Sequence, residues 1–368
     1  MKHKDLSRRE FLEITTKAVV GAAIAPMALS VVGCSPTDPA GIEKPIVSIA
    51  RIQNDNIGAA VEEAIDLLGG IDTVAKDKER IMLKPNLVAE SPTYTTKREV
   101  IQTLAQLMID AGKDVSIGEG SAAAAGFNVT GGVTYRTSRQ DILDAMQQYV
   151  FEQLGYTELA TALGVPLINL HSGDMVNVPV PDGLAFEEIT LHHALDEIDL
   201  LCSVPMMKTH VLATVTLGMK NLIGAYPGTA YCSVRACVHD QAAQAGSPGI
   251  AYEIIDMVRA NKLGLTVVDG YMAMEGDGPT GGTLAKMDVI IAGTNPLATD
   301  MVAAEVMGIG PSIVPTFTAA HAAGMTPEKI DDIEIRGAAI STVQRILVRP
   351  NVVTWESISD SWGVQELT

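Results

Sequence analysis

The alternation of strands and helices is clearest in residues 80–121, which read RIMLKPNLVAESPTYTTKREVIQTLAQLMIDAGKDVSIGEGS. Residues 80–87 are rich in apolar side chains and predict a strand. Residues 96–111 place apolar side chains at helical spacing and end before a glycine, which predicts a helix. Residues 115–117 predict the next strand. A strand, a helix and a strand in this order are typical of a parallel sheet covered by its crossover helix.

The same alternation continues on both sides of this stretch. Further strands are predicted at 46–52, 166–170, 198–204, 265–268, 289–292 and 331–335, and further helices at 57–68, from 138, at 211–222, at 252–260 and from 296. Residues 172–196 predict an inserted hairpin, whereas 122–137 and 224–249 predict loops. We therefore expect an α/β fold, a largely parallel sheet with helices on both faces and a small β-hairpin insertion. This domain would span residues 45–340, followed by a C-terminal extension at 341–368.

The net charge of the chain excludes one class of partner. Its 368 residues carry Lys+Arg 26 against Asp+Glu 44, a formal charge of −18, and only 4% of them are aromatic. Such a protein repels phosphate backbones and offers few rings for base stacking. We therefore expect no nucleic-acid partner, and an acidic surface that is either merely solvated or attracts cations.

The first residues predict a targeting signal. Ser7–Leu12 read SRREFL, the pattern of twin-arginine export signals, and the uncharged stretch Ala18–Gly33 is shorter than the ~20 residues of a membrane span. The sequence before Cys34 resembles a lipobox, whose cysteine takes a lipid, although an ordinary thiol near a plain cleavage site is the alternative. We expect a signal peptide at 1–33 and a tether at 34–44. The protein would then be exported by the twin-arginine route to the cell envelope or periplasm, as a lipoprotein held to the membrane only by its anchor.

Three further cysteines leave several roles open. Cys232 and Cys237 are spaced C-x4-C, which suits a local disulfide, two small core or loop residues, or metal ligation, and Cys202 stands alone. The chain has no C-x2-C pair and no ferredoxin-type run of cysteines. We therefore expect no iron–sulfur cluster within this chain.

Polar motifs accompany several of the predicted strands. In chain order they are Lys84-Pro85-Asn86, Gly118–Ser121, Lys208-Thr209-His210, Thr216-x3-Lys220-Asn221-x2-Gly224, His239, Asp269-Gly270-x4-Glu275-Gly276-x-Gly278-Pro279 and Asn295-Pro296-x3-Asp300. Ligands of open α/β sheets bind outside the carboxyl ends of the strands, where these motifs would meet. In this order, the motifs resemble the domain of unknown function 362 family over about residues 45–337.

The resemblance implies a family more than a mechanism. Members of that family are mostly uncharacterised, and some carry ferredoxin modules whose cysteine runs this chain lacks. Relatives often show Gly-Asp-Ser where this chain has Gly118–Ser121, which reads Gly-Glu-Gly-Ser. The resemblance also implies a fold similar to the nucleotide-like half of nickel-pincer lactate racemases.

Four residues are candidates for catalysis, namely Lys208, His210, Lys220 and Asp269. Lysines and histidines near strand ends suit an anionic ligand such as a carboxylate or phosphate. A lysine that is desolvated beside a second cation has a lowered pKa and acts as a base or nucleophile. We expect the lysines to hold or activate the anion, His210 to act as acid, base or ligand, and Asp269 to orient His210. The alternative is that both lysines are solvated or neutralise buried acids.

Eight further residues are candidates for ligand binding: Lys84, Asn86, Ser121, Asn221, Glu275, Gly276, Gly278 and Asp300. Lys84 and Asn86 would complete the pocket, and Ser121 would face the ligand from a helix N-terminus. The glycines of 275–282 let backbone N–H groups approach an anion, although a plain flexible turn explains that loop equally well. For Asp300, stabilisation of a helix dipole is the alternative.

Histidine and carboxylate side chains also suit a divalent metal. His210, His239 and Asp269 are the candidate ligands, for zinc, iron or nickel. The sequence has no closely spaced ligand pair of the H-x3-H kind, so hydrogen-bonded histidines are the alternative. No Walker, G-x-S-x-G or H-E-x-x-H motif identifies another cofactor or reaction.

Together these observations predict an uncharacterised cell-envelope protein with one site at the strand ends. We expect an enzyme or a cofactor-handling protein that acts on a small anionic ligand. The alternative is a non-catalytic lipoprotein that binds a metal or a solute for a partner protein. An envelope redox or cofactor protein would be that partner.

Overall fold

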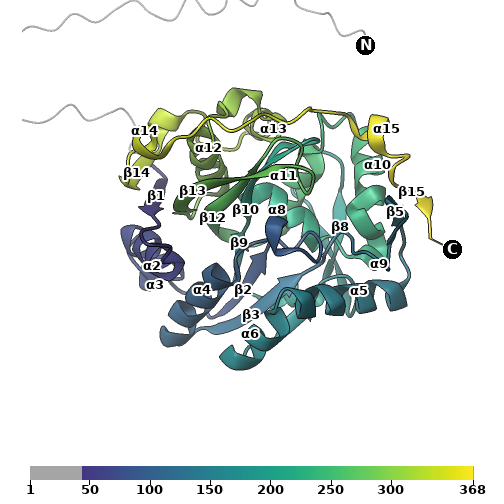
Figure 1. Ribbon diagram of the computed structural model, residues 1–368, viewed down its shortest axis with the longest axis horizontal. Helices are drawn as coiled ribbons and strands as arrows, with labels where there is room; N and C mark the ends of the chain where they lie inside the picture. Colours follow the sequence, from purple (N-terminus) through teal and green to yellow (C-terminus); the bar gives the residue numbers. More distant parts are fainter. Residues whose placement is uncertain (1–43, 368) are drawn as a thin grey trace, which may run out of the picture. The chain divides into compact units, whose positions relative to one another are not determined.

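A ten-stranded sheet organises the described chain, which is residues 44–367 of the computed structural model (Figure 1). Its strands lie in the order β14 (Glu334–Gly337), β1 (Ile46–Arg51), β13 (Thr283–Gly293), β12 (Leu263–Glu275), β9 (Leu200–Val204), β2 (Arg80–Pro85), β3 (Asp114–Glu119) and β6 (Leu167–Asn169), while β10 (Met206–His210) pairs with β12 and with β11 (Thr214–Thr216). Six of the nine pairings in this sheet are parallel. The predicted α/β fold with a largely parallel sheet is therefore confirmed.

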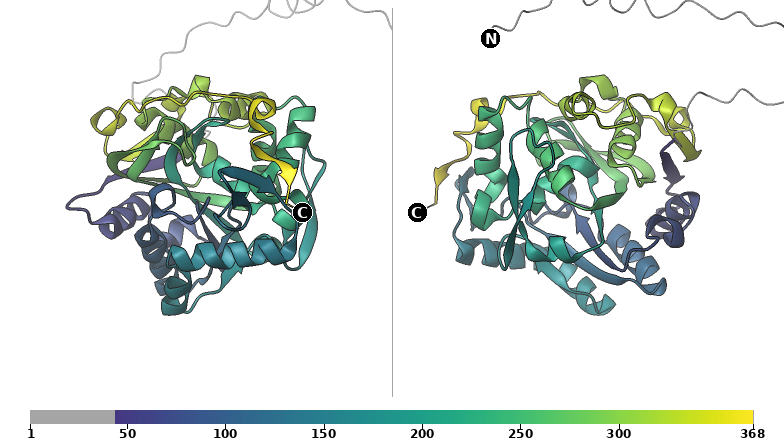
Figure 2. Two further views of the ribbon diagram at one scale, coloured as in Figure 1. Left: turned by 45° about the vertical axis from the view of Figure 1, so that its right-hand side comes forward. Right: turned by 180° about the vertical axis from the view of Figure 1, so that it is seen from behind.

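Helices cover both faces of this sheet, as predicted. One face carries α2 (Ile57–Leu67), α3 (Ile71–Val74), α4 (Arg98–Asp110), α5 (Gln140–Gln153) and α6 (Tyr156–Leu163), and the other carries α8 (Gly218–Asn221), α11 (Ala251–Ala260), α12 (Pro296–Val306) and α13 (Pro315–Ala322). Successive side chains of a strand point to opposite faces. In β2, Ile81 and Leu83 therefore join one apolar cluster and Met82 joins the other. Figures 1 and 2 show α4, α5 and α6 on the opposite side from α11, α12 and α13.

Shorter elements connect these layers. The α-helices among them are α7 (His193–Glu197), α9 (Gly228–Tyr231), α10 (Ala236–Gln244), α14 (Ile340–Val343) and α15 (Trp355–Ile358). The 3-10 helices are η1 (Pro92–Tyr94), η2 (Leu222–Ala225), η3 (Ser233–Arg235), η4 (Pro311–Ile313) and η5 (Ile330–Asp332). A small separate sheet consists of β15 (Trp362–Glu366), β5 (Val133–Arg136) and β4 (Val129–Thr130).

The predicted β-hairpin insertion is confirmed. β7 (Met175–Pro179) and β8 (Glu188–His192) pair antiparallel, apart from the main sheet. Asp256 of α11 anchors the connection between them, because its carboxylate accepts hydrogen bonds of 2.7–3.0 Å from the backbone N–H groups of residues 184–186. Asp256 is fully buried, so three backbone donors stabilise its charge in place of solvent.

The C-terminal segment crosses the surface from α14 to α15 and β15 (Figure 1). Leu347 and Trp355 are buried along this path. The backbone N–H of Val348 donates to Glu275, at the end of β12, and β15 pairs parallel with β5. Residues 344–367 thus link the main sheet to the small one.

Three segments differ from the sequence predictions. Residues 122–137, predicted as a loop, contain β4 and β5, and 224–249, also predicted as a loop, contains α9 and α10. Residues 211–222, predicted as a helix, contain β11 and only the short α8. Distant contacts that local periodicity does not encode stabilise these segments, for example the 3.0 Å bond from the N–H of Thr137 to Ser233 Oγ.

Several predictions lie outside the described residues. These are the twin-arginine signal peptide at 1–33, the lipid anchor at Cys34 and the tether at 34–44 except its last residue. Within residues 44–367, no helix has the length and apolar character needed to cross a membrane.

Removing the anchor of the hairpin should destabilise the whole fold. Asp256→Ala leaves three backbone donors without their acceptor, which should lower the free energy of unfolding by about 2–4 kcal/mol in urea denaturation. The matched control is Asp332→Ala, at an exposed aspartate, which should change it by less than about 0.5 kcal/mol. Equal stability of the two variants would show that Asp256 does not anchor the hairpin.

Candidate functional site

A buried ion pair lies at the carboxyl ends of two neighbouring parallel strands. Lys84 in β2 donates to Glu119 Oε1 in β3 at 2.7 Å, and both side chains are almost completely buried. Glu119 also accepts from the backbone N–H groups of Gly120 at 2.8 Å and Leu87 at 2.9 Å. Burial lowers the pKa of Lys84, and the Glu119 carboxylate opposes that shift. The pair therefore ties the loops after both strands to the sheet.

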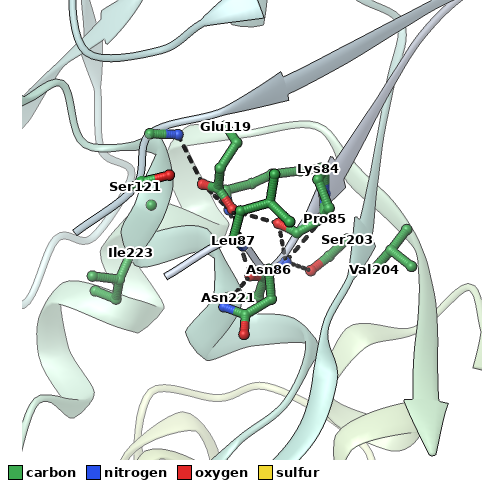
Figure 3. A network of polar contacts seen from close by, with 12 residues as sticks. Lys84, Pro85, Asn86, Leu87, Glu119, Ser121, Ser203, Val204, Asn221 and Ile223 are labelled. Carbon is green, nitrogen blue, oxygen red and sulfur yellow. Dashed lines mark hydrogen bonds and ion pairs between the residues drawn. The ribbon is translucent and has the colours of Figure 1, made fainter. Parts of the chain in front are cut away.

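Asn221, at the end of α8, connects this ion pair to a third strand (Figure 3). Its amide nitrogen donates to Ser203 Oγ in β9 at 3.1 Å and to the carbonyl oxygen of Lys84 at 3.1 Å. Its amide oxygen accepts from Asn86 at 3.1 Å and from Lys84 Nζ at 3.4 Å. Asn221 is buried, and these bonds hold it in place.

Two glycines allow the backbone to approach these charged groups closely. A Cβ atom on Gly120 would lie 2.7 Å from Arg235 Nη2, and one on Gly224 would collide with Glu119 Oε1 and with Lys84 Nζ. A side chain at either position would therefore displace the ion pair or the arginine.

Arg235 is a second buried cation, and sequence reasoning did not identify it. It makes four hydrogen bonds to backbone carbonyl oxygens, one each from Nε and Nη1 and two from Nη2, the shortest being 2.6 Å to Gly120. Burial lowers its pKa to about 10, against the opposing charge of Glu119. A disulfide joins Cys232 to Cys237 around it, and the backbone between them has positive φ at Cys232, Val234 and Arg235.

The two lysines predicted to be catalytic have different surroundings. Lys208 is fully buried, and its Nζ donates to the carbonyl oxygen of Tyr94 at 2.6 Å. Burial, and then the charge of Lys220, lowers its pKa well below the ordinary value. Lys220 is half-buried, and the described residues give its Nζ neither a hydrogen bond nor an ion pair. Burial lowers the pKa of Lys220 to about 8, with a further lowering from Lys84.

His210 is held as a neutral imidazole. Its Nδ1 accepts hydrogen bonds from the backbone N–H groups of Leu212 at 3.0 Å and Ala213 at 3.3 Å. Burial, followed by the charges of Lys220 and Lys208, lowers the pKa of His210 well below the ordinary value. The single ring proton is therefore on Nε2, which has no partner among the described residues.

His239 has the opposite arrangement. Its Nδ1 lies 2.9 Å from Glu253 Oε1, and Glu253 is fully buried with its other oxygen bonded to Ser247 at 3.1 Å. A carboxylate only accepts hydrogen bonds, so Nδ1 carries the proton, and in the neutral ring Nε2 is the acceptor. The ring of Trp355 packs against this histidine, with 4.9 Å between ring centroids.

Most of these groups line one cavity of about 160 Å³, but Lys208 is not part of its wall. Its wall includes six predicted site residues, namely Lys84, Asn86, His210, Lys220, Asn221 and His239. Sequence reasoning missed three others, Glu119, Arg235 and Trp355, whereas Thr280 belongs to the loop 275–282 that it had considered for ligand contact. Three cationic side chains face one carboxylate on this wall, in a protein whose net charge is −18. At about 30 Å³ for each water, this volume corresponds to roughly five water-sized groups, which suits small molecules.

Asp269 is not part of this site, and the role predicted for it was wrong. It lies inside β12, not after a strand end, and accepts from the N–H of Lys97 at 2.7 Å and of Tyr271 at 3.1 Å. Burial raises its pKa. Asp269 thus supports the start of α4, while backbone N–H groups orient His210. Lys208 and His210 also lie inside a strand, β10, and not after one.

Asp300 acts on the site from outside the cavity. Its carboxylate accepts from the N–H of Gly218 at 2.7 Å and of Met219 at 2.8 Å, the first residues of α8. Burial raises its pKa to about 7. Because α8 carries Lys220 and Asn221, Asp300 is a positioning residue.

The other predicted ligand-binding residues have backbone roles. Ser121 is fully buried outside the cavity wall, where its N–H donates to Gln147 at 2.6 Å. Glu275 and Gly276 pair with Val348 of the C-terminal segment. Gly278 packs against the backbone of Thr209. Only Pro279 and Thr280 of this loop line the cavity.

The predicted metal ligands do not come together. Asp269 lies elsewhere in the sheet, and residues 44–367 contain no group of three or more histidine, cysteine, aspartate or glutamate side chains suited to a metal ion. His210 and His239 both line the cavity.

Some of the missed residues had a signal in the sequence. Glu119 is the last residue of β3 and belongs to the motif Gly118–Ser121, and a buried acid at a strand end predicts a charged partner. Arg235 and Trp355 come from connecting segments and Glu253 from α11, and no local pattern sets these three residues apart.

Neutralising one member of the ion pair should destabilise the protein strongly. Glu119→Gln keeps the shape but leaves Lys84 buried without its counter-charge, which should lower the free energy of unfolding by about 3–5 kcal/mol. Urea denaturation measures this change, with Glu62→Gln at an exposed glutamate as the control. The double variant Lys84→Met/Glu119→Gln should be more stable than Glu119→Gln alone. A single variant within about 1 kcal/mol of the wild type would contradict this role for the pair.

The sequence and structure are similar to those of several known proteins. A thylakoid-associated protein of Synechocystis sp. is 27% identical over 287 residues, which cover 76% of this chain and 80% of that protein. The lactate racemase apoprotein from Thermoanaerobacterium thermosaccharolyticum has 13% sequence identity and a TM-score of 0.43 over 72% of this chain. A protein from Thermotoga maritima has 12% identity and a TM-score of 0.34 over 67% of it. The chain spans 57% of the length of each of these two structures.

The motif-based resemblance is confirmed by a match to a whole family. Residues 81–305, more than half of the chain, match the family described as Domain of unknown function (DUF362). This region contains the ion pair, the lysines and both histidines of the cavity. The chain therefore belongs to the DUF362 family.

Proposed function

We propose that this protein is an enzyme that transfers protons to and from a small organic anion bound in the cavity. One observation carries the proposal: two histidines line the same cavity with opposite hydrogen-bonding capacity. His210 offers an N–H from Nε2, because backbone donors occupy its Nδ1. His239 offers a lone pair on Nε2, because Glu253 holds the proton on its Nδ1.

This pair supplies both halves of acid–base chemistry. A histidine oriented by a buried carboxylate is a typical general base. A neutral imidazole donates a hydrogen bond to a carbonyl or carboxylate oxygen as charge develops on it. His239 would thus remove a proton from the ligand, and His210 would stabilise the anion that forms.

The charges of the cavity support an anionic ligand. Lys84, Lys220 and Arg235 line it, and only Lys84 has a carboxylate partner. Lys220 Nζ has no partner among the described residues, so a ligand carboxylate would supply its counter-charge. A bound carboxylate would also offset the excess positive charge of the cavity.

We also propose that the protein is exported and anchored to a membrane through Cys34. The SRREFL motif at Ser7–Leu12 and the lipobox-like sequence before Cys34 support export and lipidation. The disulfide between Cys232 and Cys237 suits an oxidising compartment. The thylakoid association in the name of the Synechocystis relative supports attachment to a membrane.

Proton transfer should be detectable without knowing the natural substrate. The protein should catalyse exchange of carbon-bound hydrogen with D2O in at least one member of a panel of small carboxylic, hydroxy and oxo acids, measured by proton NMR. His239→Gln should slow that exchange at least ~100-fold, and Glu253→Gln by a smaller factor.

The control is His193→Gln, an exposed histidine, which should exchange like the wild type. Binding of a panel member without exchange would favour a non-catalytic carrier. Exchange that survives His239→Gln would contradict the role of the histidine pair.

Anion affinity should fall as the pH rises through the pKa of Lys220. Lysine is cationic below its pKa, so at about pH 9 roughly a tenth of Lys220 would keep its charge, given its pKa of about 8. Propionate binding, measured by calorimetry, should weaken about tenfold between about pH 7 and about pH 9. Lys220→Met should bind propionate weakly at both pH values, whereas Lys329→Met, at an exposed lysine, should keep the pH dependence. An unchanged affinity across this range would exclude Lys220 as the charged contact.

A further inference from the structure

Lys220 differs from the other buried cations of the site, because the protein does not use its charge. Lys84 pairs with Glu119, Lys208 donates to the carbonyl oxygen of Tyr94, and Arg235 bonds four backbone carbonyls. The described residues give Lys220 Nζ no partner at all, although it lines the cavity. An amine held in this way is free to react with a ligand.

The surroundings of Lys220 also favour its neutral, nucleophilic form. Lys84 and Arg235 lie near enough to lower its pKa, with burial as the larger cause, while Glu253 opposes them. A lysine desolvated beside other cations is a typical nucleophile toward carbonyl groups. Because its pKa is about 8, roughly a tenth of the amine is uncharged at about pH 7.

The remaining groups of the cavity suit the two ends of a 2-oxo acid. The guanidinium of Arg235 has five N–H groups, of which four hydrogen bonds to the backbone leave one for a carboxylate. His210 offers its Nε2–H to the oxygen of the reacting carbonyl. A cavity of about 160 Å³ matches an acid of a few carbon atoms.

We propose that Lys220 forms an imine with the carbonyl carbon of a small 2-oxo acid. The proposal rests on the proposed function and names the substrate class of the same site. The amine attacks the 2-carbon while the Nε2–H of His210 donates a hydrogen bond to the oxygen as negative charge develops on it. That oxygen takes one proton from the attacking nitrogen and one from solvent, and it leaves as water when the C–O bond breaks and the C=N bond forms. One amine, one carbonyl and one proton thus give one iminium ion and one water.

An iminium ion would explain why the proton-transfer groups lie beside Lys220. The positive nitrogen withdraws electrons from the neighbouring carbon, so a hydrogen on that carbon becomes easier to remove. His239, with Nδ1 bonded to Glu253, is the base for that proton. The cationic cavity keeps its charge during the reaction, since the ammonium of Lys220 is replaced by an iminium.

Reductive trapping tests this directly. The full-length protein is incubated with pyruvate and sodium borohydride, which delivers hydride to the imine carbon and makes the adduct permanent. Intact-mass measurement should show one adduct per chain, and peptide mapping should place it on Lys220. Lys220→Arg should give no adduct, Lys329→Arg should react like the wild type, and His210→Gln should react at least ~10-fold more slowly.

Two further probes separate this proposal from the proposed function. Acetone, which has the carbonyl but no carboxylate, should be trapped far less than pyruvate. Propionate, which binds as an anion but forms no imine, should compete with trapping. Propionate binding without any pyruvate adduct would overturn the imine and leave the anion site intact. The absence of both would overturn the two proposals together, and an adduct spread over surface lysines would overturn the assignment to Lys220.

Discussion

The ion pair between Lys84 and Glu119 is the constraint on which the site depends. It joins the ends of β2 and β3 where both side chains are excluded from water, so neither charge can be removed without exposing the other to a low dielectric. The pair also requires a glycine at position 224, because a side chain there would collide with both charged groups. Lys84 Nζ, in turn, donates a hydrogen bond to the amide oxygen of Asn221. The strand ends, α8 and the loop of Arg235 are therefore arranged around one 2.7 Å contact.

Within residues 44–367, three buried carboxylates bind backbone N–H groups and not cations. Asp256, Asp269 and Asp300 are buried without a cationic partner, and each accepts two or three hydrogen bonds from backbone N–H groups. These carboxylates stabilise helix starts and a hairpin, and no lysine or arginine of the described chain forms an ion pair with them. This leaves the cavity with more cations than carboxylates, although acidic residues outnumber basic ones in the whole chain.

Sequence reasoning identified most strands and helices, because alternating apolar patterns reflect burial on two faces. It also identified Lys84, Asn86, Lys220, Asn221, His210 and His239, which all line the cavity. Sequence reasoning assigned Asp269 and Asp300 to the site, but the structure shows both carboxylates bound to backbone N–H groups. A carboxylate near a strand or helix end can bind a ligand or a backbone donor, and the sequence does not distinguish the two. Sequence reasoning missed Arg235 and Glu253 because their place in the site depends on how distant segments pack. The protonation of the two histidines likewise follows from neighbours that no spacing rule predicts.

The contrast between an acidic protein and a cationic cavity limits the kind of anion that the site can accept. At physiological salt, charges are screened beyond ~8 Å, so the acidic surface opposes an approaching anion only at short range. The repulsion between the acidic surface and an anion grows with the charge of the anion. The attraction of the cavity for the anion depends on Lys220 and on the one N–H of Arg235 that the backbone does not use. Two contacts of this kind neutralise a single carboxylate, and a second charge would meet Glu119 on the same wall. The electrostatics therefore favour a small monoanion over a polyanion such as a nucleotide.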